Sequence, residues 1–121
     1  MDIELDKYVK LFEGKVENFN KFCETFLIDQ AYDIVGQAKE RTPIDTGALI
    51  ESWEVDASEI SKLKVEIING MEYASIIEYG DPKTNRIAYD MISVPLNKYN
   101  ANVSKNFQKA LEDYFNWANS R

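Results

Sequence analysis

The chain has 121 residues, of which 45% are hydrophobic and 12% aromatic, so it is long and apolar enough to form one domain, residues 1–121, with a packed core. Its formal net charge of −7 argues against a protein that coats nucleic acid, because such proteins neutralise phosphates with an excess of basic residues. The absence of histidine and the single cysteine, Cys23, remove the commonest general base, the usual zinc ligands and any internal disulfide.

The N-terminal third has the hydrophobic periodicity of a long helix over residues 3–41. The apolar positions recur every three to five residues, at Tyr8, Phe12, Val16, Phe19, Cys23, Phe26, Ala31, Ile34 and Ala38. We expect this helix to be either continuous or divided at Gly14, because glycine costs a helix up to about 1 kcal/mol relative to alanine. Pro43 predicts its end, since the residue before a proline is disfavoured in the helical conformation. Cys23 lies on the apolar stripe and is interpreted as a small core residue.

Residues 42–51 are rich in turn-forming residues, and two segments of period-two alternation follow them. The alternating apolar positions are Trp53, Val55 and Ala57 in the first segment, and Leu63, Val65 and Ile67 in the second. This pattern predicts two antiparallel strands joined through residues 58–61 as a hairpin. Glu54 and Lys64 are then expected to pair across the strands.

The rest of the chain predicts a short helix, a third strand and a closing helix. The short helix covers residues 73–79 and is expected to end at Gly80, before Pro82. Residues 86–94 are predicted to form the strand, and the closing helix starts at about Asn100. The predicted fold is therefore α+β, with a long N-terminal helix, a small and mainly antiparallel sheet of about three strands, a short helix and a C-terminal helix.

The motifs that could carry chemistry all have simpler interpretations. Residues 45–47 spell the Asp-Thr-Gly of retroviral-type aspartic proteases, but those are all-β, whereas here the tripeptide follows a long helix and a proline. We interpret it as a turn closed by Asp45 and Gly47. Glu72, Glu78 and Asp81 match no metal loop and are interpreted as a solvated acidic patch, while Tyr73 and Tyr79 are interpreted as half-buried packing. The sequence thus predicts no enzyme, no metal site and no cofactor.

Charge is unevenly distributed along the chain. Residues 40–81 carry ten acidic and three basic residues, whereas residues 82–121 carry three acidic and six basic residues. Two interpretations stay open: solvated faces, or a head-to-tail contact between the acidic face of one copy and the basic face of the next, as in a ring. Under the second interpretation, charge reversal of Lys105 and Lys109 should impair ring assembly.

Two segments together resemble a known family. Residues 38–49 read AKERTPIDTGAL and precede Ser52 and Trp53, while residues 65–69 read VEIIN and residues 73–80 read YASIIEYG. They resemble the head–tail joining (tail-completion, neck) proteins of long-tailed phages and prophages, the family called "gene product ten-like". Its members have Thr-Pro-Val-Asp-Thr-Gly-x-Leu and Ser-Trp after a helix, then a strand ending in Asn and Tyr-Ala-x-x-Val-Glu-Tyr-Gly. Ile50 stands where the family usually has Arg, and residues 91–96 match its later Phe-Leu-x-Pro-Ala-Leu stretch only loosely.

The resemblance implies a structural protein of phage or prophage morphogenesis that completes the tail and joins it to the head connector, as a homo-oligomeric ring, often of six copies. It implies synthesis in the bacterial cytoplasm, a place at the head–tail junction of the virion, and contacts with the head connector and the tail tube or tail terminator. Neither nucleic acid nor membrane is an expected partner. The motif residues expected either to fix the fold or to line a subunit contact are Thr42, Pro43, Asp45, Thr46, Gly47, Leu49, Trp53, Asn69, Tyr73, Ala74, Glu78, Tyr79 and Gly80.

A second interpretation, of a different class, is a small acidic intracellular module that binds another protein as an inhibitor or adaptor. The motifs place the phage interpretation first, because both occur in the family's order and at its spacing.

Overall fold

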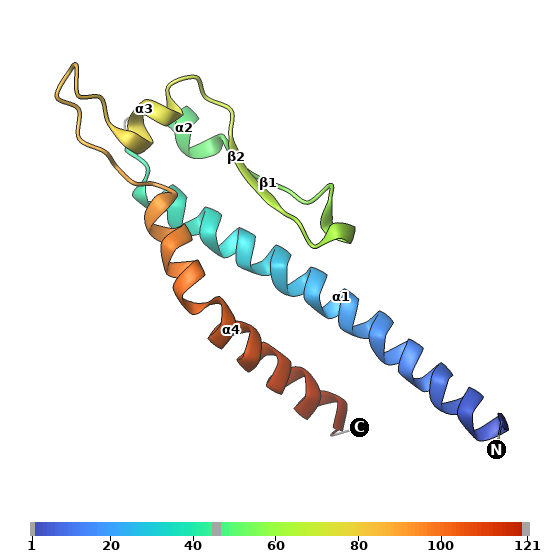
Figure 1. The fold of residues 1–121 in the computed structure, drawn as a ribbon. Coiled ribbons are helices and arrows are strands. Elements are labelled where there is room, and N and C mark those ends of the chain that lie inside the picture. The colour runs from blue at the N-terminus through green and yellow to red at the C-terminus, as the bar shows by residue number, and fades with distance from the viewer. Residues whose placement is uncertain (1, 45–46, 120–121) are drawn as a thin grey trace.

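The computed structural model describes residues 2–44 and 47–119 of the chain. In chain order the elements are α1 (Asp2–Arg41), α2 (Gly47–Glu51), β1 (Trp53–Asp56), the 3₁₀ helix η1 (Ile60–Lys62), β2 (Glu66–Asn69), α3 (Ala74–Tyr79) and α4 (Ser93–Asn119). Figure 1 shows α1 as the central element, with the β1–β2 hairpin against one side and α4 against the other. The predicted α+β class is confirmed, with two strands where about three were expected.

The predicted N-terminal helix is confirmed as one continuous helix of 40 residues, so Gly14 does not divide it. At 1.5 Å per residue, α1 is about 60 Å long. It ends where the Thr42 backbone N–H bonds to the carbonyl of Lys39 at 3.2 Å, a bond that spans three residues instead of the four of a regular α-helix. Pro43 follows and prevents continuation.

An aromatic cluster holds α4 against α1. The ring centroids of Phe26 and Phe107 lie 5.1 Å apart, as do those of Phe22 and Tyr114. Because residue numbers rise along α4 as they fall along α1, the two helices run antiparallel. Cys23 lies half-buried on the same stretch of α1, and burial raises the pKa of its thiol. A thiol that stays protonated is a poor nucleophile, which favours the interpretation of Cys23 as a packing residue.

The hairpin is confirmed, but its second strand starts later than predicted. In the ladder Trp53 lies opposite Asn69 and Val55 opposite Ile67. The strand begins at Glu66 because η1 and Leu63, with φ of 55°, turn the chain before it. The loop therefore covers residues 57–65 instead of 58–61.

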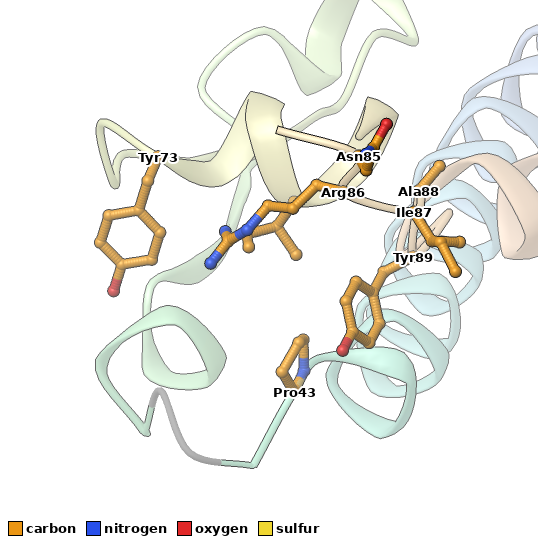
Figure 2. A pocket seen from close by; sticks show the side chains of 8 residues that line it. Pro43, Tyr73, Asn85, Arg86, Ile87, Ala88 and Tyr89 are labelled. Carbon is orange, nitrogen blue, oxygen red and sulfur yellow. The ribbon is translucent and has the colours of Figure 1, made fainter. Parts of the chain in front are cut away.

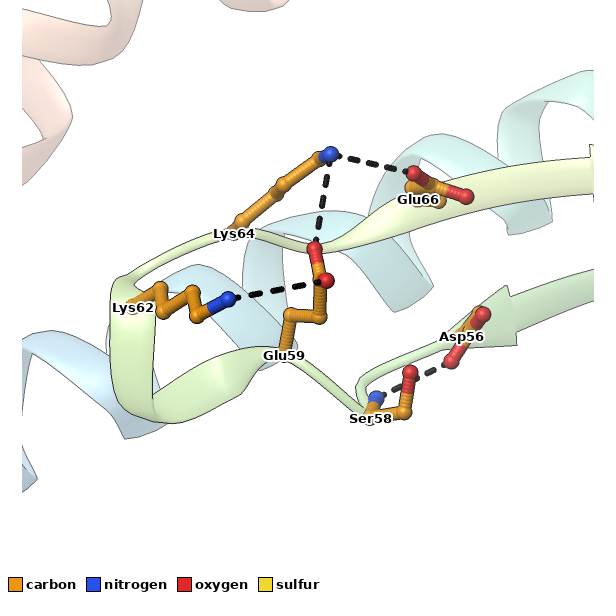
Figure 3. A network of polar contacts seen from close by, with 6 residues as sticks. All are labelled: Asp56, Ser58, Glu59, Lys62, Lys64 and Glu66. Carbon is orange, nitrogen blue, oxygen red and sulfur yellow. Dashed lines mark hydrogen bonds and ion pairs between the residues drawn. The ribbon is translucent and has the colours of Figure 1, made fainter.

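The expected pair of Glu54 and Lys64 is wrong, because Glu54 lies opposite Ile68. The Lys64 amine lies 3.4 Å from a carboxylate oxygen of Glu59 and 3.3 Å from one of Glu66 (Figure 3). These side chains are about half exposed, so the ion pairs contribute little to stability and mainly order the loop.

The predicted third strand at residues 86–94 is wrong. This segment folds back over the end of α3, where the N–H of Tyr89 bonds to the carbonyl of Ile77 at 2.9 Å. The N–H of Asp90 bonds to the carbonyl of Glu78 at 3.2 Å, and Asp90 has φ of 49°, which a strand would not tolerate. Hydrogen bonds to α3 thus replace those of a sheet.

The C-terminal helix starts at Ser93, seven residues before the predicted start at Asn100. Pro95 is the third residue of this helix. Its missing N–H has no cost in the first turn of a helix, where backbone N–H groups lack partners within the helix. Pro95 is fully buried there.

The core is small and lies at the C-terminal end of α1, between α2, the hairpin and α3. Its members are Val35, Ala38, Leu49, Trp53, Ile77 and Met91. The segment from α3 to α4 closes this core through Met91, which is fully buried.

Gly80 allows the chain to leave α3 toward that segment, as predicted. It has φ of 76°, and a Cβ there would lie 2.6 Å from the carbonyl oxygen of Arg86 and 2.9 Å from the nitrogen of Ala88. An L-residue is strained in this conformation, and the clashing atoms are backbone atoms that cannot move aside.

We therefore expect Gly80→Ala to lower the free energy of unfolding by roughly 2–3 kcal/mol, measured by urea denaturation. Gly36→Ala is the matched control, because Gly36 lies in α1 with open space around it. It should leave stability unchanged or raise it by up to about 1 kcal/mol. Equal effects of the two substitutions would contradict the strain assigned to Gly80.

Candidate functional site

The described motif residues gather at one end of the molecule, where the C-terminal end of α1 meets α2, α3 and the start of α4 (Figure 1). Sequence reasoning expected them to fix the fold or to line a contact. Four of them, Thr42, Trp53, Asn69 and Glu78, make buried or part-buried side-chain hydrogen bonds that connect one element to another. Asp45 and Thr46 lie outside the described residues, so their predicted turn is not assessed.

Thr42 and Trp53 connect α1 to the hairpin. The Thr42 hydroxyl donates to the carbonyl of Ala38 at 2.6 Å and accepts the indole Nε1–H of Trp53 at 2.9 Å. Both side chains are buried. A hydroxyl that can donate and accept at once is needed here, since a buried indole N–H without an acceptor costs about 1–3 kcal/mol.

Asn69 connects the hairpin to α2. Its Nδ2 donates to the carbonyl of Leu49 at 3.0 Å, and its Oδ1 accepts the N–H of Met71 at 3.1 Å. Leu49 itself is fully buried in the core. The amide therefore fixes both the end of β2 and the turn into α3.

Glu78 connects α3 to α4. It is 4% exposed, which corrects the predicted solvated acidic patch. Its carboxylate accepts the backbone N–H groups of Ile92 and Ser93, each at 2.9 Å, and the Ser93 hydroxyl. These are donors at the start of α4, so Glu78 caps that helix from another element, where the helix dipole favours negative charge.

The remaining described motif residues have packing or surface positions. Tyr73 and Ala74 pack against the core. Gly47 starts α2 with open space around it. Tyr79 is 73% exposed, so its predicted half-buried packing is wrong, whereas that of Tyr73 is confirmed.

The hydrogen-bonded residues Thr42, Trp53, Asn69 and Glu78, with the elements they connect, are called the frame below. An open groove of about 850 Å³ lies beside this frame. Figure 2 shows the Arg86 side chain extending into it between Tyr73 and Tyr89, with Pro43 at its floor. Arg41 fixes the wall, because its guanidinium donates to the carbonyl oxygens of Asp90 at 3.0 Å and Tyr89 at 3.3 Å.

Sequence reasoning missed Arg86 and Ile87 as groove residues because it assigned them to a strand. Residues 85–89 all line the groove, so this segment does not alternate between two faces as a strand would. Ile87 lines the groove and is 83% exposed.

Across the described residues, no group of three or more acidic or cysteine side chains is placed to hold a metal ion. No helix among them combines the length and apolar character that a membrane crossing requires. The groove is lined by aromatic, aliphatic and arginine side chains, which suits contact with another protein better than acid–base chemistry.

Glu78→Ala is expected to lower the free energy of unfolding by roughly 2–3 kcal/mol in urea denaturation, because it leaves the N–H groups of Ile92 and Ser93 without their acceptor. Glu78→Gln keeps one acceptor oxygen and should cost about 1 kcal/mol less. Glu72→Gln, at an exposed carboxylate, is the control and should change stability by less than about 0.5 kcal/mol. A Glu78→Ala protein as stable as this control would contradict the capping role.

Comparison with known proteins agrees with the motif. Residues 4–80 match the HK97-gp10-like family, described as "Bacteriophage HK97-gp10, putative tail-component". No significant match to the chain was found among curated proteins or among solved structures. The match covers α1, the hairpin and α3, the elements that carry both motifs. Because it spans well over half of the chain, the chain belongs to the HK97-gp10-like family of phage tail-component proteins.

Proposed function

We propose that this phage tail-component protein completes the tail and joins it to the head connector, as a ring of identical copies at the head–tail junction, and that it is not an enzyme. The observation that carries the proposal is the apolar surface exposed beside the groove. The partners are then other copies, the head connector and the tail tube or tail terminator.

Large apolar side chains are exposed on the frame that the motif residues build. Ile44 is 89% exposed, Ile87 83% and Tyr79 73%. Ile44 follows Pro43 of the groove, and Tyr79 precedes Gly80, whose backbone closely approaches that of residues 86–88. Exposed apolar residues gathered at one place mark protein contacts more often than solvent-facing surface.

The frame beneath this surface is suited to docking because it is rigid. Each buried polar side chain in it has a hydrogen-bond partner among the described residues. A preformed surface loses little conformational entropy on binding, so more of the contact energy appears as affinity. Arg86 adds a cation that would select a partner with an acidic group opposite it.

The proposal that the chain is not an enzyme is supported by the positions of its reactive side chains. Cys23 is half-buried on α1 and burial raises the pKa of its thiol, and the Glu78 carboxylate caps α4. An acidic inhibitor or adaptor would present its negative charge at its binding face. The groove presents Arg86 and apolar side chains instead, which favours the joining function.

The first test is electron microscopy of a lysate made by phage lacking the gene. We expect filled heads and separate, finished tails, because both assemble but cannot be joined. Expression of the wild-type chain from a plasmid should restore joined particles. Intact, infectious particles without the gene would overturn the proposed function.

The second test asks whether the exposed apolar surface matters. A Tyr79→Ser, Ile87→Ser double variant should fold but give at least about tenfold fewer joined particles in that complementation assay, since burial of each such side chain is worth roughly 1.5–3 kcal/mol. Tyr32→Ser, at a 62% exposed residue of α1, is the control and should complement fully. Full complementation by the double variant would show that the exposed apolar surface beside the groove is not the docking surface.

A further inference from the structure

We propose that successive copies of the chain contact one another through two different surfaces, the lysine stripe of α4 on one copy and the outer face of the β1–β2 hairpin on the next. The lysine stripe is formed by Lys98, Lys105 and Lys109, and the outer hairpin face by Glu54, Asp56, Glu66 and Ile68. This inference rests on the proposed ring and specifies the surfaces that build it.

The lysine stripe follows from helix geometry. Its members are seven and four residues apart, which places them on one side of a helix with 3.6 residues per turn. Phe107 and Tyr114 pack toward α1, so Lys105 and Lys109 lie on the other side of α4. All three lysines are exposed, and no ion pair found among the described residues involves them.

The acidic character of the outer hairpin face follows from strand alternation. Trp53 and Val55 turn toward the core, so Glu54 and Asp56 lie on the opposite face. In β2 the outward residues are Glu66 and Ile68. Asp56 lies opposite Glu66 in the ladder, and like charges in that position destabilise a hairpin. Lys64 offsets the charge of Glu66 from within the chain, and a cation from outside would offset that of Asp56.

A hollow at the end of the hairpin is of a size to receive such a cation. It has a volume of about 170 Å³ and is lined by Asp56, Ser58, Glu59, Lys64 and Glu66. Figure 3 shows Lys64 engaged with Glu59 and Glu66, which leaves the Asp56 carboxylate as the acid without a cation in this group. The backbone N–H of Ser58 bonds to Asp56 at 2.9 Å and lowers the pKa of that carboxyl, so it is charged at neutral pH.

The two surfaces cannot meet within one chain, because α1 lies between the hairpin and α4 (Figure 1). A contact between opposite and unlike faces is heterologous, and its repetition produces a closed ring when the rotation closes. The charge pattern thus favours the same head-to-tail arrangement at each step of the ring.

Apolar surface lies within both charged surfaces. Ile68 is 38% exposed in the middle of the outer hairpin face. On α4 the exposed Ala101 lies one turn before Lys105, and the lysine stems add further apolar area. This matters because exposed ion pairs alone contribute at most about 1 kcal/mol each. The charges then set direction and register, and the apolar residues supply affinity.

Charge reversal in two variants tests this arrangement. The α4 variant carries Lys105→Glu and Lys109→Glu, and the hairpin variant carries Glu54→Lys and Glu66→Lys. We expect the wild-type chain to self-associate in sedimentation velocity with an affinity that falls as salt rises. Each variant alone should associate at least tenfold more weakly, because its two surfaces then repel one another.

An equimolar mixture of the two variants should recover association to within about threefold of wild type. In the mixture every contact between unlike chains again joins a basic surface to an acidic one, so the assemblies should contain even numbers of chains. Lys39→Glu on α1 with Lys83→Glu in the loop after α3 is the control, because both lysines are exposed and lie outside the two surfaces, and it should associate like wild type. Undiminished association of either reversed variant, or no recovery in the mixture, would overturn the inference.

If the chain associates only when other virion proteins are present, the contact is tested in lysates of infected cells instead. A carbodiimide couples a lysine amine to a carboxylate that it contacts, and mass spectrometry of mixed isotope-labelled and unlabelled chains identifies links between copies. We expect links from Lys105 or Lys109 to hairpin carboxylates. A wild-type chain that is monomeric in solution and gives no such links in lysates would overturn the inference.

These readouts do not depend on joining. Self-association with the expected links, in a phage that assembles normally without the gene, would leave the inference intact and refute the proposed function. If the deletion phage fails to join heads to tails but lysates with the wild-type chain show no such links, the proposed function would stand and the inference would be refuted.

Discussion

The buried carboxylate of Glu78 sets the direction of the C-terminal helix, α4. It belongs to a helix of six residues, α3, yet it binds the first backbone donors of α4, a helix of 27 residues. Backbone donors at the start of a helix point along its axis, so an anion held at that point fixes where the axis begins and roughly how it runs. From there α4 returns along α1, and the aromatic contacts of Phe26 and Phe107 complete the pairing.

Glu78 is one of several polar side chains that substitute for a large core. The fully packed core has only a few members, and much of α1 lies beyond them. Thr42, Trp53 and Asn69 supply hydrogen bonds between the elements that meet around this core. Such bonds are directional, and an unmet one is costly when buried, so they specify one arrangement more sharply than apolar contact does. In this sense, the family motif specifies the hydrogen bonds that join the elements around a small core.

How far the sequence predicts this fold depends on whether the deciding interactions are local. The periodicity of α1 and the alternation of Trp53 and Val55 arise from neighbours along the chain, and both elements were predicted correctly. Gly80 was predicted as the end of α3 for a reason equally local, its freedom at positive φ. The segment from Arg86 to Ile92 failed because its partners are the carbonyls of Ile77 and Glu78, which no local pattern reveals.

The same reason explains what was predicted of the candidate site. Motif residues could be named, but their division into buried linkers and exposed surface could not. Glu78 and Tyr79 are neighbours in the sequence, and one is 4% exposed while the other is 73% exposed. Local chemistry would have buried the tyrosine and exposed the acid. Only the arrival of the α4 donors at Glu78 reverses that order.

The surfaces invoked for joining and for ring formation lie on different parts of the molecule. The groove lies at the end where α1, α2 and α3 meet, whereas the lysine stripe and the outer hairpin face lie on the two sides of α1. A ring whose subunits touch through their sides keeps their ends available for proteins above or below it. The apolar groove end would then be repeated around the ring, and many weak contacts in register give a strong junction, because each one raises the effective concentration of the next. A frame made rigid by buried hydrogen bonds suits this geometry, since a small angular error in one subunit would be carried around every step of a closed ring.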